Sequence, residues 1–322
     1  PGIDNIIPHA LKNLGDTAIS RLVRIYQASY LLGYVPNKWL ASNVKFLPKA
    51  GKDSYDKPNS FRPISLMSYL HKALEKILLW RIEETTLKDK PLHYDQHGFR
   101  PGFSCDSALT GVVGQVEYTI QQRSQGLGIF CDLEGAFNAV SYEAIISGLK
   151  KRKFDPLFIE WYKYYLYNRF FTIDLKGQKL TKTCSRGVPQ GGVLSPLAFG
   201  IATEDVLNLF DEDKPDPSLK EDIAGNTPDS NDSSAEPHVT PISASRNKKR
   251  RQPKNKKTKA KTARKTKNTP KPAVRTTVTT TAFADDLCFY ISGGSPETLQ
   301  KKAQFVMDKA AAWSHTKGMR FS

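Results

Sequence analysis

The sequence has few sulfur-containing residues and no long apolar run. It has four cysteines and three methionines among 322 residues. Cys105, Cys131, Cys184 and Cys288 have neither the spacing of a metal site nor close partners, a pattern typical of reduced thiols in an intracellular protein. No secretion signal and no apolar span of membrane length are present, so nothing in the sequence ties the chain to a membrane.

Residues 211–275 lack aromatic side chains and have almost no large aliphatic ones. Residues 211–236 carry nine acids against two lysines, whereas residues 246–275 carry fifteen Lys or Arg and no acid. Such a segment cannot offset the entropy lost on ordering, so we expect a disordered charged insertion at 211–275. Its basic run is interpreted as a nuclear-import signal, as a nucleic-acid tether or as a merely solvated charged loop.

The formal net charge is +16, which favours a polyanionic partner. Basic residues also exceed acidic ones outside the insertion. We therefore expect a basic nucleic-acid channel on the folded part of the chain.

Three aspartates stand at the ends of strand-forming runs. Asp132 follows the run 127–131, and Asp285 and Asp286 lie between the runs 277–281 and 287–291. β-Branched and aromatic residues predict a hairpin with the last two aspartates at its tip, and a third, buried strand that delivers Asp132. Converging carboxylates can hold divalent cations for hydroxyl attack on a nucleoside triphosphate. The structural alternative is a turn at Asp-Asp and a helix cap at Asp132.

A turn rich in glycine and proline, RGVPQGGVLSP, occupies residues 186–196. The two glycines after Gln190 let the backbone approach a base pair or a sugar closely. The alternative is an ordinary helix start with Ser195 as N-cap and Pro196 at the first helical position, and the two interpretations are compatible.

Apolar residues at helical spacing predict three helices with buried faces. The predicted buried positions are Leu22, Ile25 and Leu32 in the first helix, Leu70, Leu74, Ile77 and Trp80 in the second, and Leu299, Ala303, Val306, Ala310 and Trp313 in the third. Ser295-Pro296 opens the third helix and Gly318 ends it. Residues 170–178 predict a hairpin, either structural or gripping a primer.

In their order, these motifs resemble the reverse transcriptases of non-LTR (LINE-type) retrotransposons. The resemblance covers roughly residues 1–210 and 276–322, and RPISL favours this class over retroviral and LTR enzymes, with group II intron enzymes as a weaker competitor. The matching segments are PGID at 1–4, FLPKAGK at 46–52, SFRPISL at 60–66, HKALEKIL at 71–78, QHGFRPG at 96–102, YLYNR at 165–169, the PQG loop and FADD at 283–286.

The resemblance implies an α+β fold, namely the fingers and palm of a right-hand polymerase with an antiparallel palm sheet flanked by helices. Fingers with part of the palm would occupy residues 1–125, and the palm residues 126–210 and 276–322. The chain stops at residue 322, where the family's next motif supplies a lysine that protonates the leaving group. We therefore expect that lysine and the thumb to be absent, as in a fragment or a truncated reading frame.

Carried over residue by residue, the resemblance implies a metal site of Asp132, Asp285 and Asp286, with Leu133 contributing its carbonyl. Two Mg²⁺ ions, or Mn²⁺ as an alternative, would be the cofactors. Phe137 matches the bulky residue that excludes a ribose 2′-hydroxyl. Asn138 replaces the family's usual Asp, which is not a metal ligand, so we expect a modest cost.

The remaining matches concern substrate binding. Gln190 and Gly191 match residues that line the nascent base pair, and Arg100 matches a template-side position. Lys49 and Arg62 match basic fingers residues, whose charges would neutralise a triphosphate. For Lys49 a solvated loop lysine is the alternative, whereas Arg62 is expected to be buried between its apolar neighbours.

The expected function is RNA-templated DNA synthesis, with an RNA template, a DNA primer and deoxynucleoside triphosphates as partners and the nucleus as the site of action. Two alternatives stay open. One is a decayed or host-adopted protein that binds nucleic acid without catalysis. The other is a group II intron-type maturase.

Overall fold

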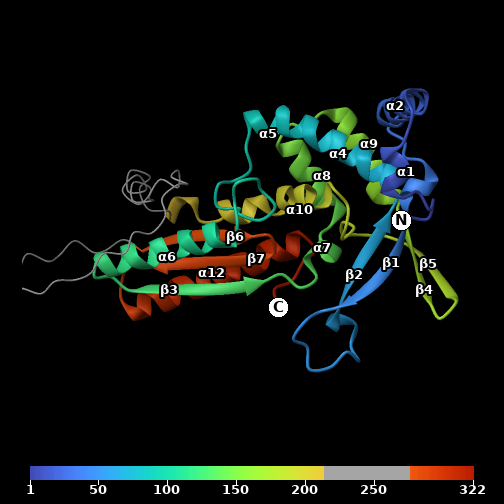
Figure 1. The fold of residues 1–322 in the computed structure, drawn as a ribbon. Helices are drawn as coiled ribbons and strands as arrows, with labels where there is room; N and C mark the ends of the chain where they lie inside the picture. The colour runs from blue at the N-terminus through green and yellow to red at the C-terminus, as the bar shows by residue number, and fades with distance from the viewer. Residues whose placement is uncertain (214–275) are drawn as a thin grey trace, which may run out of the picture. The chain divides into compact units, whose positions relative to one another are not determined.

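The computed structural model describes residues 1–213 and 276–322, so most of the predicted insertion, including the basic run 246–275, lies outside the described residues. Two β-sheets organise the described part (Figure 1). Their strand orders are β2-β1-β4-β5 and β3-β7-β6. The strands are β1 (Ala41–Pro48), β2 (Phe61–Met67), β3 (Gly126–Asp132), β4 (Phe170–Leu175), β5 (Gln178–Thr183), β6 (Thr277–Phe283) and β7 (Asp286–Ser292).

The three-stranded sheet is antiparallel throughout, as predicted for the strands that carry the aspartates. Its central strand β7 buries every residue from Leu287 to Ile291, whereas β6 buries alternate residues. The prediction that β3 is buried was wrong: it is one of the two edge strands, and Phe130 is 72% exposed. An edge strand has a neighbouring strand on one side only, so its side chains can stay exposed to solvent. Its apolar residues therefore predicted more burial than the strand has.

The four-stranded sheet joins distant segments. β1 pairs with β2 antiparallel and with β4 in parallel, and β4 and β5 form the hairpin predicted at 170–178. Its two-residue loop, Lys176-Gly177, has φ of 52° and 87°. Two positive φ values in a two-residue loop match the twist of the flanking strands.

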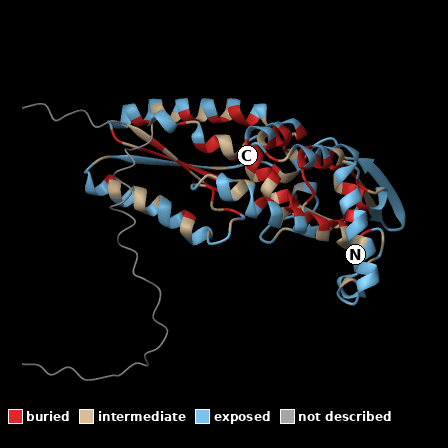
Figure 2. Cartoon of the chain, turned by 90° about the horizontal axis from the view of Figure 1, so that it is seen from above, coloured by how far each residue is buried: buried red, intermediate tan, exposed pale blue. Residues whose placement is uncertain are grey.

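Helices cover both faces of the three-stranded sheet. α6 contacts β6 and β7 on one face, and α12 contacts β3 and β7 on the other (Figures 1 and 2). Buried residues gather on the inward sides of the helices (Figure 2). The α-helices are α1 (Pro8–Lys12), α2 (Asp16–Leu31), α3 (Asn37–Leu40), α4 (Tyr69–Glu84), α5 (Thr86–Asp89), α6 (Cys105–Gln121), α7 (Ala136–Ala139), α8 (Tyr142–Lys151), α9 (Pro156–Asn168), α10 (Ser195–Thr203) and α12 (Pro296–Thr316).

The third predicted helix is confirmed as α12, which Ser295 caps and after which Gly318 has φ of +72°. The buried faces of the other two were partly wrong, because Ile25, Leu32, Ile77 and Trp80 are exposed. On α4 the buried face instead includes the polar pair His71 and Glu75. None of the helices in the described ranges is both long and apolar enough to cross a membrane.

Candidate active site

Asp132 and Asp286 are direct cross-strand partners at the ends of β3 and β7. Residues paired in this way point to the same face of a sheet, with Cα atoms about 4.5–5.5 Å apart. Asp285 precedes Asp286 in the two-residue loop between β6 and β7, so the hairpin predicted to carry both aspartates at its tip is confirmed. The structure thus brings together all three predicted carboxylates.

The chain turns sharply after Asp132. Gly135 has φ of +57° and precedes the short helix α7. The Leu133 amide donates to the Asp285 carbonyl at 3.4 Å, and the Asp132 carbonyl accepts from the Ser322 amide at 2.9 Å. These backbone bonds tie the end of β3 to the hairpin tip and to the last residues of the chain.

The carboxylates of Asp285 and Asp286 both have raised pKa values. The pKa of Asp285 is raised above its ordinary value, first by burial and then by the charges of Asp286 and Asp132, while the positive charge of Arg62 lowers it. The pKa of Asp286 is raised by burial and by Asp132. Neighbouring negative charges destabilise one another when ionised, so a cation at this position would stabilise the group.

The donor set fits Mg²⁺ chemically. Magnesium prefers oxygen ligands and is usually held by one or two carboxylates together with substrate phosphates rather than by a cage of protein side chains. In residues 1–213 and 276–322 no group of three or more His, Cys, Asp or Glu side chains is arranged to hold a metal ion by itself. The Leu133 carbonyl accepts from the Ala136 amide at 3.3 Å, which leaves one of its lone pairs for a ligand.

A cavity of about 330 Å³ adjoins the carboxylates. It lies between the sheet face that carries Asp132 and Asp286 and the N-terminal half of α6, where Leu109 and Val112 line it. Phe130, exposed on the edge strand, lines the same cavity. The cavity beside the aspartates is therefore partly apolar.

The glycine-rich turn packs against the four-stranded sheet. The Gln190 carbonyl accepts from the Ser65 amide of β2 at 2.8 Å. Gly191 has φ of +121°, and a Cβ there would lie 2.9 Å from the Ser65 carbonyl oxygen. Only glycine fits this close approach without strain. A helix does start after the turn, but α10 has Leu194 rather than Ser195 as its N-cap.

Phe137 lies in an aromatic cluster beside the site. Its ring stacks on Phe199 with centroids 4.9 Å apart, and Phe99 meets it edge-on at 5.8 Å. Its carbonyl accepts from the Val188 amide, which links α7 to the glycine-rich turn. The Phe137 ring is therefore fixed on two sides and half-buried.

The three predicted basic residues differ in their surroundings. Arg62 was predicted to be buried and is instead exposed, because it pairs with the end of β1 at which residues 45–48 are all exposed; its charge nevertheless acts on Asp285. The Arg100 guanidinium donates to the carbonyls of His93 and Gln96 at 2.6 and 3.2 Å, so it holds its own loop. Lys49 follows β1, where its backbone bonds with Ser60 and Tyr55. The template and triphosphate roles of these residues stay predictions.

Residues 47–224, more than half of the chain, match the family described as "Reverse transcriptase (RNA-dependent DNA polymerase)". The chain belongs to the reverse transcriptase family. The resemblance to non-LTR retrotransposon enzymes is thereby confirmed at the level of the family, and curated relatives point the same way.

The chain is 31% identical over 207 residues to a Drosophila melanogaster protein named "Probable RNA-directed DNA polymerase from transposon BS", covering 64% of this chain and 23% of that protein. It is 30% identical over 209 residues to the "RNA-directed DNA polymerase from mobile element jockey" of the same organism, with 64% and 22% covered. This reverse transcriptase chain therefore spans about a quarter of the length of these relatives.

A solved structure titled "Structure of apo telomerase from Candida Tropicalis truncated from C-terminal domain" matches 95% of this chain and 54% of its own at 13% identity, with a TM-score of 0.47. A likeness this distant carries no functional argument.

Two buried polar residues of this reverse transcriptase were missed from sequence. Glu75 on α4 accepts a 2.8 Å hydrogen bond through Oε2 from the amide of Val193, directly after the two glycines. Gln96 accepts from the amide of Ala284, which precedes Asp285 and Asp286, at 3.1 Å. Both lie in segments that resemble family motifs, but each segment contains other polar or charged residues, so the sequence did not single out Glu75 or Gln96.

Proposed function

We propose that this chain catalyses RNA-templated DNA synthesis, adding deoxynucleotides to the 3′-hydroxyl of a DNA primer. The observation that carries the proposal is the cross-strand pairing of Asp132 with Asp286, with Asp285 adjoining in the turn. Membership of the reverse transcriptase family supports it. Because the chain spans only part of the length of its relatives, its activity, its template and its primer are proposals of their own and are not transferred from those relatives.

The three aspartates would hold two Mg²⁺ ions, or Mn²⁺, at the end of the three-stranded sheet where Asp132 pairs with Asp286. When bound, these ions lower the pKa of an attacking hydroxyl and stabilise charge on the phosphates. Asp132 and Asp286 supply the paired carboxylates, and the backbone bond from Leu133 keeps Asp285 beside them. Arg62, whose charge lowers the pKa of Asp285, would neutralise part of a triphosphate.

The surrounding elements are assigned accordingly. The three-stranded sheet with α6 and α12 would be the palm, and the four-stranded sheet, which contacts the glycine-rich turn, would belong to the fingers. Gln190 and Gly191 would line the nascent base pair, because Gly191 brings backbone to the surface without a side chain. Phe137, fixed by Phe99 and Phe199, would exclude a 2′-hydroxyl and so select deoxynucleotides.

Primer extension tests the proposal. The 322-residue chain and Asp285→Ala would be incubated with a primed RNA template, deoxynucleotides and Mg²⁺, while template-primer binding is measured in parallel by fluorescence anisotropy. Extension by the unchanged chain that disappears in Asp285→Ala, with binding retained in both, supports the polymerase. Equal binding with no extension by either protein contradicts it and favours a binding protein without catalysis.

We also propose that the basic run 246–275, outside the described residues, directs the protein to the nucleus. A fluorescent fusion of the full chain would accumulate in nuclei, and replacing the four residues 248–251 by alanine would reduce that accumulation. An unchanged distribution contradicts the proposal.

A further inference from the structure

The turn that carries Asp285 has an unusual backbone for its sequence. Ala284, the first of the two loop residues between β6 and β7, has φ of +58°. A side chain with a Cβ disfavours this left-handed conformation, which glycine adopts freely. The turn therefore needs contacts from outside the hairpin to hold Ala284, and through it Asp285, in place.

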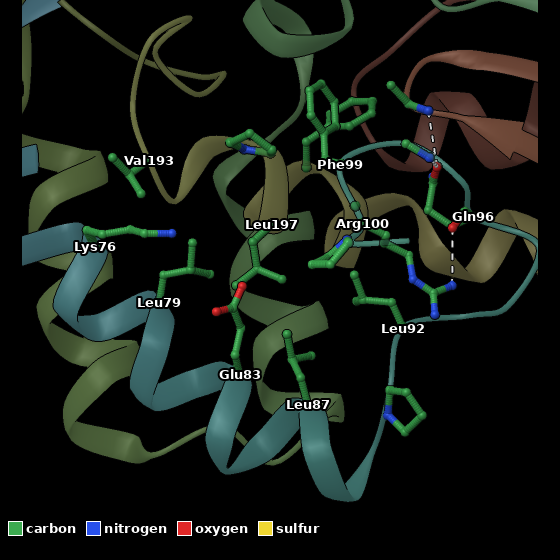
Figure 3. A pocket seen from close by; sticks show the side chains of 17 residues that line it. Lys76, Leu79, Glu83, Leu87, Leu92, Gln96, Phe99, Arg100, Val193 and Leu197 are labelled. Carbon is green, nitrogen blue, oxygen red and sulfur yellow. Dashed lines mark hydrogen bonds between the residues drawn. The ribbon is translucent and has the colours of Figure 1, made fainter. Parts of the chain in front are cut away.

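Those contacts come from the loop 95–98, which is far away in the sequence. Gln96 is 6% exposed, and its Oε1 accepts two hydrogen bonds, from the Gly98 amide at 2.9 Å and from the Ala284 amide at 3.1 Å. Figure 3 shows the side chain with its bonds beside a cavity of about 680 Å³. One buried amide oxygen thus joins the loop to the catalytic turn.

The loop is itself attached to β6 by backbone bonds. The His97 amide donates to the Ala282 carbonyl at 2.8 Å, and the Ala282 amide donates to the Asp95 carbonyl at 2.9 Å. The Arg100 guanidinium donates to the Gln96 carbonyl at 3.2 Å, which fixes the backbone of Gln96 from the other side (Figure 3). The Gln96 side chain therefore starts from a fixed position.

Gly98 completes the contact. A Cβ at this residue would lie 2.3 Å from the Ala284 amide nitrogen and 3.0 Å from its Cα, so the two backbones touch. A close approach of this kind allows no other residue without displacement of the turn. Loop 95–98 and the catalytic turn are thus packed as one unit.

We propose that Gln96 is a positioning residue for the reaction: its side-chain oxygen holds the left-handed Ala284 and so fixes Asp285 relative to Asp132 and Asp286. The inference rests on the proposed polymerase function for its kinetic consequence, although the contact does not. Gln96 touches neither substrate nor metal in this role. It acts through the backbone of the turn, and displacements of about 1 Å at reacting groups can cost about 100-fold in rate.

Two substitutions separate the oxygen acceptor from the size of the side chain. Gln96→Met keeps the length and removes the acceptor, whereas Gln96→Glu keeps an acceptor oxygen. Gln121→Met, on the exposed end of α6, is the matched control. In single-turnover extension, Gln96→Met is expected to lower the maximal rate by about 100-fold, with the KM for deoxynucleotide and the Kd for template-primer within about 3-fold of the unchanged chain. Gln96→Glu is expected to recover at least 10-fold of that loss, by the same positioning argument.

Amide hydrogen exchange, followed by NMR, reads the contact without catalysis. Exchange at Ala284 is expected to be faster in Gln96→Met than in Gln121→Met, while amides in the core of α9 exchange as before. An Ala284 exchange rate that is the same in Gln96→Met as in Gln121→Met overturns the inference. So does an extension rate of Gln96→Met equal to that of Gln121→Met, provided the unchanged chain is active. If the unchanged chain extends no primer, the proposed function fails separately, and exchange at Ala284 alone decides the positioning role.

Discussion

Oε2 of Glu75 accepts a 2.8 Å hydrogen bond from the backbone amide of Val193. The bond joins the middle of α4 to the residue that follows the two glycines of the PQG turn, and the Glu75 side chain is completely buried. The turn proposed to line the nascent base pair is therefore anchored to a carboxyl group inside the fold.

Burial raises the pKa of Glu75 to about 7, although the Val193 amide and Lys72 act in the opposite direction. Its neighbour His71 has a pKa lowered to about 3 by burial, so it is neutral and the 3.7 Å contact between them is not an ion pair. The fold thus favours a protonated Glu75. Stability from this group is fully present below its unfolded pKa of about 4.5 and is lost as the pH rises towards 7.

Glu75→Gln should therefore flatten the pH dependence of stability. The amide keeps an acceptor for Val193 and has no charge to bury, so at pH 8 the variant is expected to be more stable than the unchanged chain by on the order of 1–3 kcal/mol. At pH 5 the difference should shrink. Urea unfolding at both pH values measures this, with Glu83→Gln on the exposed side of α4 as control. At each pH the unfolding free energy of Glu75→Gln is compared with that of the unchanged chain. A difference that favours the variant less at pH 8 than at pH 5 would contradict the argument.

Gly191→Ala tests the close approach of the PQG turn to β2. The new Cβ would lie 2.9 Å from the Ser65 carbonyl oxygen at φ of +121°. We expect a loss of unfolding free energy of about 1–2 kcal/mol and a higher KM for deoxynucleotide. Gly200→Ala is the matched control, because a Cβ there meets nothing within 4 Å and the residue lies inside α10. That control should gain stability by about 0.5–1 kcal/mol. Similar effects of the two substitutions would rule out the steric explanation.

Phe137→Val tests the choice of sugar. The smaller side chain leaves space beside Phe99 and Phe199 where the ring now lies. The ratio of kcat/KM for deoxynucleotides to that for ribonucleotides is expected to fall by about 10–100-fold, mainly through better use of ribonucleotides. Phe305→Val on the exposed side of α12 serves as control. An unchanged ratio in a folded, active Phe137→Val variant would remove Phe137 from the selection of the sugar.

Arg62→Gln tests the electrostatic link to Asp285. The Arg62 charge lowers the pKa of Asp285, so its removal should raise that pKa further and move the acid limb of the rate profile to higher pH. The KM for deoxynucleotide should also rise, by about 10-fold for the loss of a charge-assisted contact with phosphate. Single-turnover rates between pH 5.5 and 9 measure both effects, with exposed Arg24→Gln as control. An acid limb at the same pH, together with an unchanged KM for deoxynucleotide, would show that Arg62 has no role at the site.

Local patterns predicted the elements that hold the aspartates. The β-branched and aromatic runs around residues 283–286 were enough to place Asp285 and Asp286 at a hairpin tip, because strand propensity and turn chemistry act over a few residues. The cap at Ser295 was equally local. These features need no knowledge of the rest of the fold.

Register and burial between distant segments were not predictable in the same way. Nothing local shows that Asp132 pairs with Asp286 rather than Asp285, or that β1 lies parallel to β4. Arg62 was expected to be buried from its apolar neighbours, yet it pairs with the exposed end of β1. Gln96 and Glu75 depend on contacts across long stretches of sequence, so their roles became visible only when the segments were brought together.

The most direct measurement is the Mg²⁺-dependent single-turnover rate of primer extension by the unchanged chain, Asp132→Asn, Asp286→Asn and the double variant, with template-primer affinity measured alongside. If the cross-strand pair acts as one unit, each single variant loses at least about 100-fold in rate while affinity stays within about 3-fold, and the double variant is hardly slower than the singles. Extension by Asp132→Asn at the rate of the unchanged chain would contradict a catalytic role for the pair.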